Sequence, residues 1–233
     1  MTEEDILKAC HTAYAAGKSS VKLYFIIGLP TEEYADLDGI AELAANAAEE
    51  YYRTPDRNKA KPVSVTISVA CFIPKPFTPF QWCGQNFMEE LRAKQTYLME
   101  KLRGNRKVRY NWHEAEVSFV EAVFARGDRR LSAALLEARR RGVRFDAWDE
   151  FFNYDQWLDI FEAVKLDPSF YANRFIGRDE ILPWDMIDVG VSPAFLGREY
   201  DKAMRAEPSE NCRESCMNCG ANRLGGVRSC CPM

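Results

Sequence analysis

Five of the chain's eight cysteines lie within its last 22 residues, where their thiols could bind a metal. Cys212, Cys216 and Cys219 have the spacing C-x3-C-x2-C within the stretch NCRESCMNCG, and Cys230 and Cys231 follow. Four thiolates can hold either a tetrahedral zinc ion or an iron–sulfur cluster, and soft sulfur ligands do not discriminate between the two. The alternative is a terminal segment that binds no metal. We favour a metal site and leave open which of Cys230 and Cys231 is a ligand.

The sequence RGDRR at residues 126–130 forms a second candidate site. Its arginines could bind a phosphate or carboxylate group of a substrate. In the alternative interpretation, Gly127 ends one helix, Asp128 caps the next, and the arginines face solvent or pair with acidic side chains. We favour this second interpretation. The catalytic residues stay unknown, because His113 could serve as a general base only within a cleft.

The composition is that of an ordinary globular protein, with 47% hydrophobic and 28% charged residues. A net charge of −4 disfavours a nucleic-acid partner. The N-terminus MTEEDILKAC lacks the apolar core of a signal peptide, and no apolar run is long enough to span a membrane. We therefore expect a cytoplasmic protein that binds neither nucleic acid nor membrane. In a reducing cytosol its cysteines are not expected to form disulfides.

Hydrophobic periodicity predicts the elements that position these groups. Helix and strand alternate in the first half of the chain, with helices expected at 4–16, 32–51 and 87–102 and strands at 21–28 and 63–73. Thr31 is expected to cap the second helix. The first strand, VKLYFIIG, is a short continuous apolar run, which is typical of a strand buried on both faces in a parallel sheet. A third strand could lie in VRYNWHEA at 108–115.

The second half of the chain has a helical pattern. Residues 143–200 are rich in Trp, Phe and Asp, which indicates short helices packed by aromatic side chains. The composition changes again at about 204–210, where the cysteine-rich tail starts. We therefore predict an α/β segment at 1–106, a helical extension at 107–203 and a metal-binding tail at 204–233.

Two or three parallel strands would leave a hydrophobic sheet edge exposed to water. The chain also opens on a helix that has no preceding strand. We therefore expect further strands of the same sheet to lie upstream of this sequence.

The order of several motifs resembles one enzyme family. GLPTEE at 28–33 resembles the fifth-strand motif of radical S-adenosylmethionine (SAM) barrels, commonly G-x-I-x-G-x-x-E or G-L/F-P-G-E-T, and FIPKPFTPFQW at 72–82 resembles their sixth strand. Together with VEAVFARGDRR, FDAWDEFF, ILPWD and the terminal cysteines, these motifs resemble the C-terminal half of bacterial radical SAM proteins with an N-terminal cobalamin (B12)-binding domain. The resemblance covers nearly the whole chain. It implies an α/β fold: the last two to three parallel strands of a partial (β/α) barrel, then a mostly helical extension and the tail.

In such barrels SAM lies across the carboxyl ends of the strands. The turn after strand five packs against the adenosine, and the backbone after strand six commonly hydrogen-bonds the adenine. Carried over to this sequence, the resemblance implies these cofactor-binding residues: Gly28, Leu29, Pro30, Thr31, Cys71, Phe72, Ile73 and Pro74. Two positions depart from the motif. Tyr24 stands where its first glycine is often found, and Thr31 stands where glycine or glutamate is usual.

The resemblance also implies a catalytic [4Fe–4S] cluster that binds SAM and cleaves it reductively, held by cysteines in a loop after the first strand. Those ligands, the first four strands and the cobalamin domain would lie in a missing N-terminal half, in the same chain or in a separate subunit. NCRESCMNCG has the spacing of the catalytic motif, but Asn218 stands where that motif prefers an aromatic residue. We therefore expect the tail to hold an auxiliary iron–sulfur cluster or zinc.

Two hypotheses follow. In the first, the chain is part of a radical SAM enzyme that contributes the adenosine-binding side of the SAM site and an auxiliary metal site, and is inactive on its own. In the second, it is a non-catalytic zinc or iron–sulfur subunit that docks by its open sheet edge onto a separately encoded half-barrel. The substrate and the reaction type are not marked by any motif.

Overall fold

A computed structural model describes residues 2–223 of the chain. These residues form two compact units. Unit 1 is built from the residues up to Phe72 and from Asn86–Ser118, and unit 2 from Ile73–Gln85 and the residues from Phe119 on. This division differs from the three predicted segments, because residues 73–85 join the second unit and residues 107–118 join the first.

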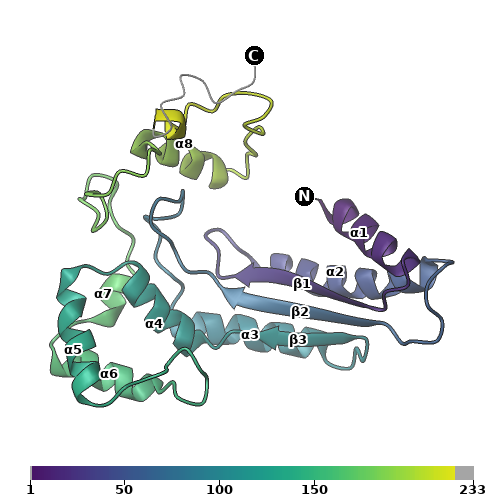
Figure 1. The fold of residues 1–233 in the computed structure, drawn as a ribbon, viewed down its shortest axis with the longest axis horizontal. Coiled ribbons are helices and arrows are strands. Elements are labelled where there is room, and N and C mark those ends of the chain that lie inside the picture. The colour runs from purple at the N-terminus through teal and green to yellow at the C-terminus, as the bar shows by residue number, and fades with distance from the viewer. Residues whose placement is uncertain (1, 224–233) are drawn as a thin grey trace. The chain divides into compact units, whose positions relative to one another are not determined.

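The centre of unit 1 is a three-stranded sheet in the order β1-β2-β3 (Figure 1). The strands are β1 (Ser20–Ile27), β2 (Ser64–Cys71) and β3 (Val108–Trp112). Both pairs are parallel, with Ile27 opposite Cys71 and Val69 opposite Trp112. The predicted α/β class and the third strand are therefore confirmed.

The helices of unit 1 cover one face of this sheet: α1 (Glu3–Ala15), α2 (Tyr34–Arg53) and α3 (Met88–Leu102). Figure 1 shows α2 and α3 running behind the strands. The predicted apolar stripe of α2 packs into the core, since Leu37, Ala44 and Tyr51 are buried there with Ile67 of β2. Burial of this continuous apolar layer is the main source of the unit's stability.

The opposite face of the sheet is partly exposed, so the expectation that β1 is buried on both faces is wrong. Lys22, Tyr24 and Ile26 point away from the helices, and the last two are 73% and 51% exposed. The helices supply apolar contacts to the alternate residues Val21, Leu23 and Phe25 only. A strand needs a layer on each side to be buried on both faces, and unit 1 provides one such layer.

The start of α2 also differs from the prediction. Thr31 is not its cap, because the helix begins at Tyr34 with Glu33 at the cap position. Glu33 N–H donates to Asp36 Oδ2 at 2.8 Å, and Asp36 N–H donates to the Glu33 carbonyl at 3.0 Å in return. This reciprocal capping satisfies two of the backbone donors that a helix start leaves unpaired.

Unit 2 is helical in the residues that the structure describes. Its elements are α4 (Ala115–Ala125), whose first turn belongs to unit 1, η1 (Arg129–Leu131), α5 (Ser132–Arg140), α6 (Tyr154–Ala163), α7 (Pro168–Ala172), α8 (Pro193–Ala203) and η2 (Ala221–Arg223). Aromatic side chains pack several of them, as predicted: Phe124 contacts Trp157 edge to face, and Trp82 lies buried with Trp184 and Leu196. None of the helices from residue 2 to residue 223 is long and apolar enough to cross a membrane.

Candidate functional site

The carboxyl ends of β1 and β2 meet at one edge of the sheet, where parallel α/β sheets generally bind ligands. Gly28 follows Ile27, the register partner of Cys71, so the turn after β1 lies beside the end of β2. Phe72 N–H donates to Ile27 O at 2.7 Å, which extends the pairing by one residue. The six residues Gly28–Thr31 and Cys71–Phe72 thus lie at neighbouring strand ends, and their role in binding a cofactor stays a prediction.

Gly28 is required by both conformation and space. Its φ is +83°, a region that side-chain-bearing residues rarely adopt. A Cβ atom at this position would lie 2.8 Å from Asn86 Oδ1 and 3.0 Å from Leu91 Cδ2. Its N–H donates to Glu32 Oε1 at 2.8 Å, which closes the turn.

A buried ion pair supports the turn from below. Lys94 Nζ lies 2.9 Å from Glu32 Oε1, and the two side chains are only 4% and 5% exposed. Glu90 lies 3.2 Å from the same ammonium group, and Asn86 Oδ1 accepts from it at 3.3 Å. Burial by itself would lower the pKa of Lys94, but the hydrogen bonds and charges of Glu32 and Glu90 outweigh burial and raise it. The lysine therefore stays charged.

The sequence patterns do not single out either member of this pair. Glu32 fits the first turn of the second predicted helix, where acidic residues are common. Lys94 lies on α3 among buried positions such as Leu91 and Leu98. A lysine within that apolar stripe was the feature of the sequence that could have indicated a buried ion pair. A buried lysine almost always needs an acidic partner, and GLPTEE supplies one.

The tip of the turn is more open. Leu29 and Pro30 are half-buried, and Thr31 is exposed. Thr31 has a φ of +67°, which is strained for a β-branched residue and unstrained for glycine. Backbone strain of this kind is concentrated at ligand-binding turns.

Cys71 lies on the helix-covered side of the sheet, so its thiol does not point toward the open face. It is 4% exposed, packed with Leu91 and Ala115, and approached by Gln95 Nε2 at 3.5 Å. Burial raises the pKa of this thiol. A ligand at the strand ends could use the backbone here, but not a reactive thiolate. The Phe72 N–H is already committed to Ile27 O.

Ile73 and Pro74 begin the segment that belongs to unit 2. Ile73 is half-buried and Pro74 is buried. His113 is exposed, and its carbonyl accepts from Gln95 Nε2 at 2.7 Å.

The open face of the sheet carries rows of side chains that lead toward the strand ends and that are small on β2 and large on β1. Lys22, Thr66 and Arg109 are register partners in one row, as are Tyr24, Ser68 and Asn111 in the next, with Ile26 and Ala70 last. The strand β2, with its alternating Ser, Thr and Ala, presents these small residues to the uncovered face. None of these residues was among the predicted site residues. The alternation of small and apolar residues in SVTISVAC could have indicated that one face of this strand is uncovered.

The described part of the tail is a loop held to the start of α8. Ser192 N–H donates to Cys219 O at 2.8 Å, and a Cβ atom on Gly220 would lie 2.7 Å from Gly190 O. Cys212 and Cys216 are exposed and Cys219 is half-buried. From residue 2 to residue 223, no three His, Cys, Asp or Glu side chains are grouped closely enough to hold a metal. Cys230 and Cys231 lie outside the described residues, so the predicted metal site stays a prediction.

Comparison with known proteins leaves the family open. No family model and no solved structure matches the chain. An uncharacterized protein of Methanocaldococcus jannaschii is 29% identical over 160 residues, which are 69% of this chain and 33% of that protein. The matched region therefore spans about a third of the length of this relative.

Proposed function

We propose that the chain is the C-terminal part of a radical SAM enzyme of the type with an N-terminal cobalamin-binding domain. In this proposal the turn after β1 and the end of β2 bind the adenosine part of SAM. The observation that carries the proposal is the backbone of the turn GLPTEE. Gly28 and Thr31 both have positive φ, and they occupy the two glycine positions of G-L/F-P-G-E-T. Thr31, which stands at the second of these positions, thus keeps the conformation that glycine favours.

The uncovered sheet face further supports this proposal. In a closed or partly closed barrel, that face lines the interior, where the substrate binds. Here the face carries small and polar side chains such as Thr66, Ser68 and Asn111, which leave room for a ligand and can hydrogen-bond it.

The edge of β1 supports the further proposal of a preceding half-barrel, in the same chain or in a separate subunit. β1 is an edge strand among the described residues. Beside it lies an apolar hollow of about 490 Å³, lined by Ile6 and Ala9 of α1 and by Leu23 and Phe25 of β1. A preceding strand and its helix would pair with this edge and fill this hollow.

In this proposal the two halves of the barrel have different roles. The cluster of the other half would supply the electron that cleaves SAM. The residues of this chain would hold the adenosine in place, with Lys94 and Glu32 fixing the turn and Gly28 letting the turn pack closely on Asn86 and Leu91. Cys212, Cys216 and Cys219, with Cys230 or Cys231, would form an auxiliary metal site. The chain alone would bind adenosine without cleaving SAM.

Amide NMR of the full 233-residue chain tests the binding role. We expect SAM and 5′-deoxyadenosine to shift the signals of Gly28, Thr31 and Phe72, and guanosine to leave them unchanged. The variant Gly28→Ala should lose these shifts, because its Cβ atom would press on Asn86 and its φ would be strained. Gly39→Ala is the matched control, since Gly39 lies in α2 and a Cβ atom there would have no neighbour within 4 Å.

Two results would contradict the proposal. One is a set of SAM-dependent shifts that leaves the ends of β1 and β2 unchanged. The other is release of 5′-deoxyadenosine from SAM by this chain alone after anaerobic reconstitution with iron and sulfide. That second result would make the terminal cysteines the catalytic cluster site.

A further inference from the structure

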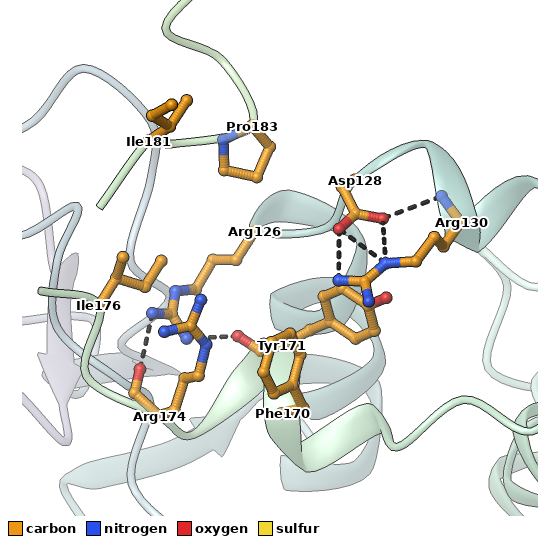
Figure 2. A pocket seen from close by; sticks show the side chains of 9 residues that line it. All are labelled: Arg126, Asp128, Arg130, Phe170, Tyr171, Arg174, Ile176, Ile181 and Pro183. Atoms are coloured by element: carbon orange, nitrogen blue, oxygen red, sulfur yellow. Dashed lines mark hydrogen bonds and ion pairs between the residues drawn. The ribbon is translucent and has the colours of Figure 1, made fainter.

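Unit 2 contains a cavity of about 160 Å³ whose wall is rich in arginine (Figure 2). Arg126 and Arg130 come from the RGDRR stretch, and Arg174 follows α7. Phe170 and Tyr171 of α7 contribute aromatic rings. The cavity lies wholly within unit 2 and is separate from the strand ends of unit 1.

The structure corrects part of the expectation for RGDRR. Asp128 does cap the next helix, accepting from Arg130 N–H at 2.9 Å. Arg126, however, does not face solvent: it is 2% exposed. Its guanidinium donates to the carbonyls of Tyr171, Ala172 (2.8 Å) and Arg174 (2.7 Å), as the dashed lines in Figure 2 show in part. These bonds satisfy carbonyls at the end of α7.

Arg126 has no acidic partner among the residues that the structure describes. Asp128, which lines the cavity, pairs with Arg130 at 2.6 Å, and Glu180 pairs with Arg174 at 3.0 Å. Burial, together with the charge of Arg174, lowers the pKa of Arg126 to about 10, so the guanidinium is still charged at neutral pH. A buried charge without a counter-ion is costly, and an oxyanion in the cavity would offset that cost.

A second observation also indicates a missing acceptor. Arg126 Nε is buried and has no hydrogen-bond partner in the described chain. Fewer than about a tenth of buried polar groups are left in this state. The Nε–H and an Nη–H of one guanidinium form the fork that binds carboxylate and phosphate oxygens.

The other two arginines are held in place by aromatic rings. The Arg174 guanidinium lies 4.5 Å from the centroid of Phe170, and that of Arg130 lies 5.5 Å from the centroids of Phe170 and Tyr171. Stacking of this kind restricts the side-chain rotamers before a ligand arrives. The cost of ordering these arginines on binding is therefore small.

The size and surroundings of the cavity define the ligand. A volume of about 160 Å³ is room for a carboxylate or phosphate group. A more open hollow of about 540 Å³ adjoins it and shares Asp128, Arg130, Ile181 and Pro183. Ile181 and Met186 on its wall are 90% and 87% exposed, which is unusual for large apolar side chains.

We propose that this site binds an organic anion whose carboxylate or phosphate group enters the arginine-lined cavity and whose apolar part lies against Ile181 and Met186. The site does not depend on SAM binding by unit 1.

Isothermal titration calorimetry of the full chain tests this site, with phenyl phosphate, benzoate and inorganic phosphate as probes at matched ionic strength. We expect phenyl phosphate or benzoate to bind, and the tighter of the two to identify the anionic group. Arg174→Gln should weaken that probe by about tenfold or more, because it removes a charged hydrogen bond. Arg139→Gln, an exposed arginine at the end of α5, is the matched control and should leave the affinity unchanged.

A second variant tests the apolar part of the site without touching the arginines. Met186→Ala should weaken phenyl phosphate and leave inorganic phosphate unaffected. Heat evolution no larger than that with chloride for all three probes would overturn the proposal. Equal losses in Arg174→Gln and Arg139→Gln would also overturn it, since general surface charge would then account for the binding.

Discussion

At the level of single residues, Lys94 is the side chain on which the turn after β1 depends. Its ammonium group contacts Glu32 and Glu90, and Glu32 in turn accepts the Gly28 N–H. The lysine thereby joins α3 to the turn that ends β1. Because the Lys94 and Glu32 side chains are both almost fully buried, removing the lysine leaves the charge of Glu32 without a cationic partner in a low-dielectric environment.

We expect Lys94→Met to lower the free energy of unfolding by about 3–5 kcal/mol, the usual cost of breaking a buried ion pair from one side. Lys101→Met is the control: it removes the pair with Asp38 at 2.8 Å, in which the side chains are 45% and 36% exposed. That exposed pair should contribute about 1 kcal/mol or less. Urea unfolding measures both values. Equal decreases in the free energy of unfolding of the two variants would show that the Lys94 pair is not desolvated in solution.

At the level of elements, the segment 82–85 and the segment 172–176 lie against each other within unit 2. Gln85 N–H donates to Ala172 O at 2.8 Å, and Ile176 N–H donates to Trp82 O at the same distance. Gly84 makes this approach possible, since a Cβ atom there would lie 1.8 Å from Asn173 O. The two segments can therefore approach this closely only because residue 84 is a glycine.

Gly84→Ala should therefore destabilise unit 2 by about 1–3 kcal/mol, because the two backbones must move apart and weaken these hydrogen bonds. Gly197→Ala provides the matched change within α8, where a Cβ atom would meet only Arg178 Nη1 at 3.9 Å. That variant should gain about 0.5–1 kcal/mol from helix propensity. Thermal unfolding followed by tryptophan fluorescence reports mainly on unit 2, which holds four of the five tryptophans, while Trp112 lies in β3 of unit 1. A stabilised Gly84→Ala would be inconsistent with the close approach.

The sequence predicted those elements whose residue pattern lies within one continuous stretch of the chain. The parallel strands, the apolar stripe of α2 and the aromatic packing of unit 2 follow from periodicity and composition, and Gly28 followed from its turn motif. Contacts between residues far apart in the chain did not follow. The pairing of Glu32 with Lys94 and the burial of Arg126 against α7 depend on how elements pack, which a single sequence does not encode in any one window.

At the level of the whole molecule, both units carry surface carboxylates that are stabilised in their charged form. The hydrogen bond from Lys101 holds the pKa of Asp38 below its ordinary value of 3.8. Arg130 does the same for the pKa of Asp128, and Arg178 for the pKa of Asp201. For Glu180 the Gly177 N–H and then Arg174 lower the pKa from its ordinary 4.5. The unfolded chain, with ordinary pKa values, binds protons on these groups first as the pH falls.

The free energy of unfolding should therefore be nearly constant between about pH 6 and 8. It should fall as the pH drops below about 4.5, because a carboxylate with a lowered pKa stabilises the folded chain only at a pH above that pKa. Urea midpoints measured from about pH 3 to pH 8 check this, with the fall expected at roughly pH 3–4.5. Arg178→Gln should make the fall shallower, since the pKa of Asp201 in the folded chain then lies closer to its ordinary value, with only Arg205 still lowering it. A midpoint that rises on acidification would contradict the sign of these shifts.

The exposed edge of β1 has a consequence for the behaviour of the chain in concentrated solution. Its outward backbone groups have no neighbouring strand among the described residues, and SVKLYFII contains one charged residue, Lys22. Charged residues and short length are the usual protection against edge-to-edge aggregation, and this strand is eight residues long and mostly apolar. Copies of the chain can therefore pair through β1, so its solubility should be limited by this strand and improved by one further charge at Tyr24.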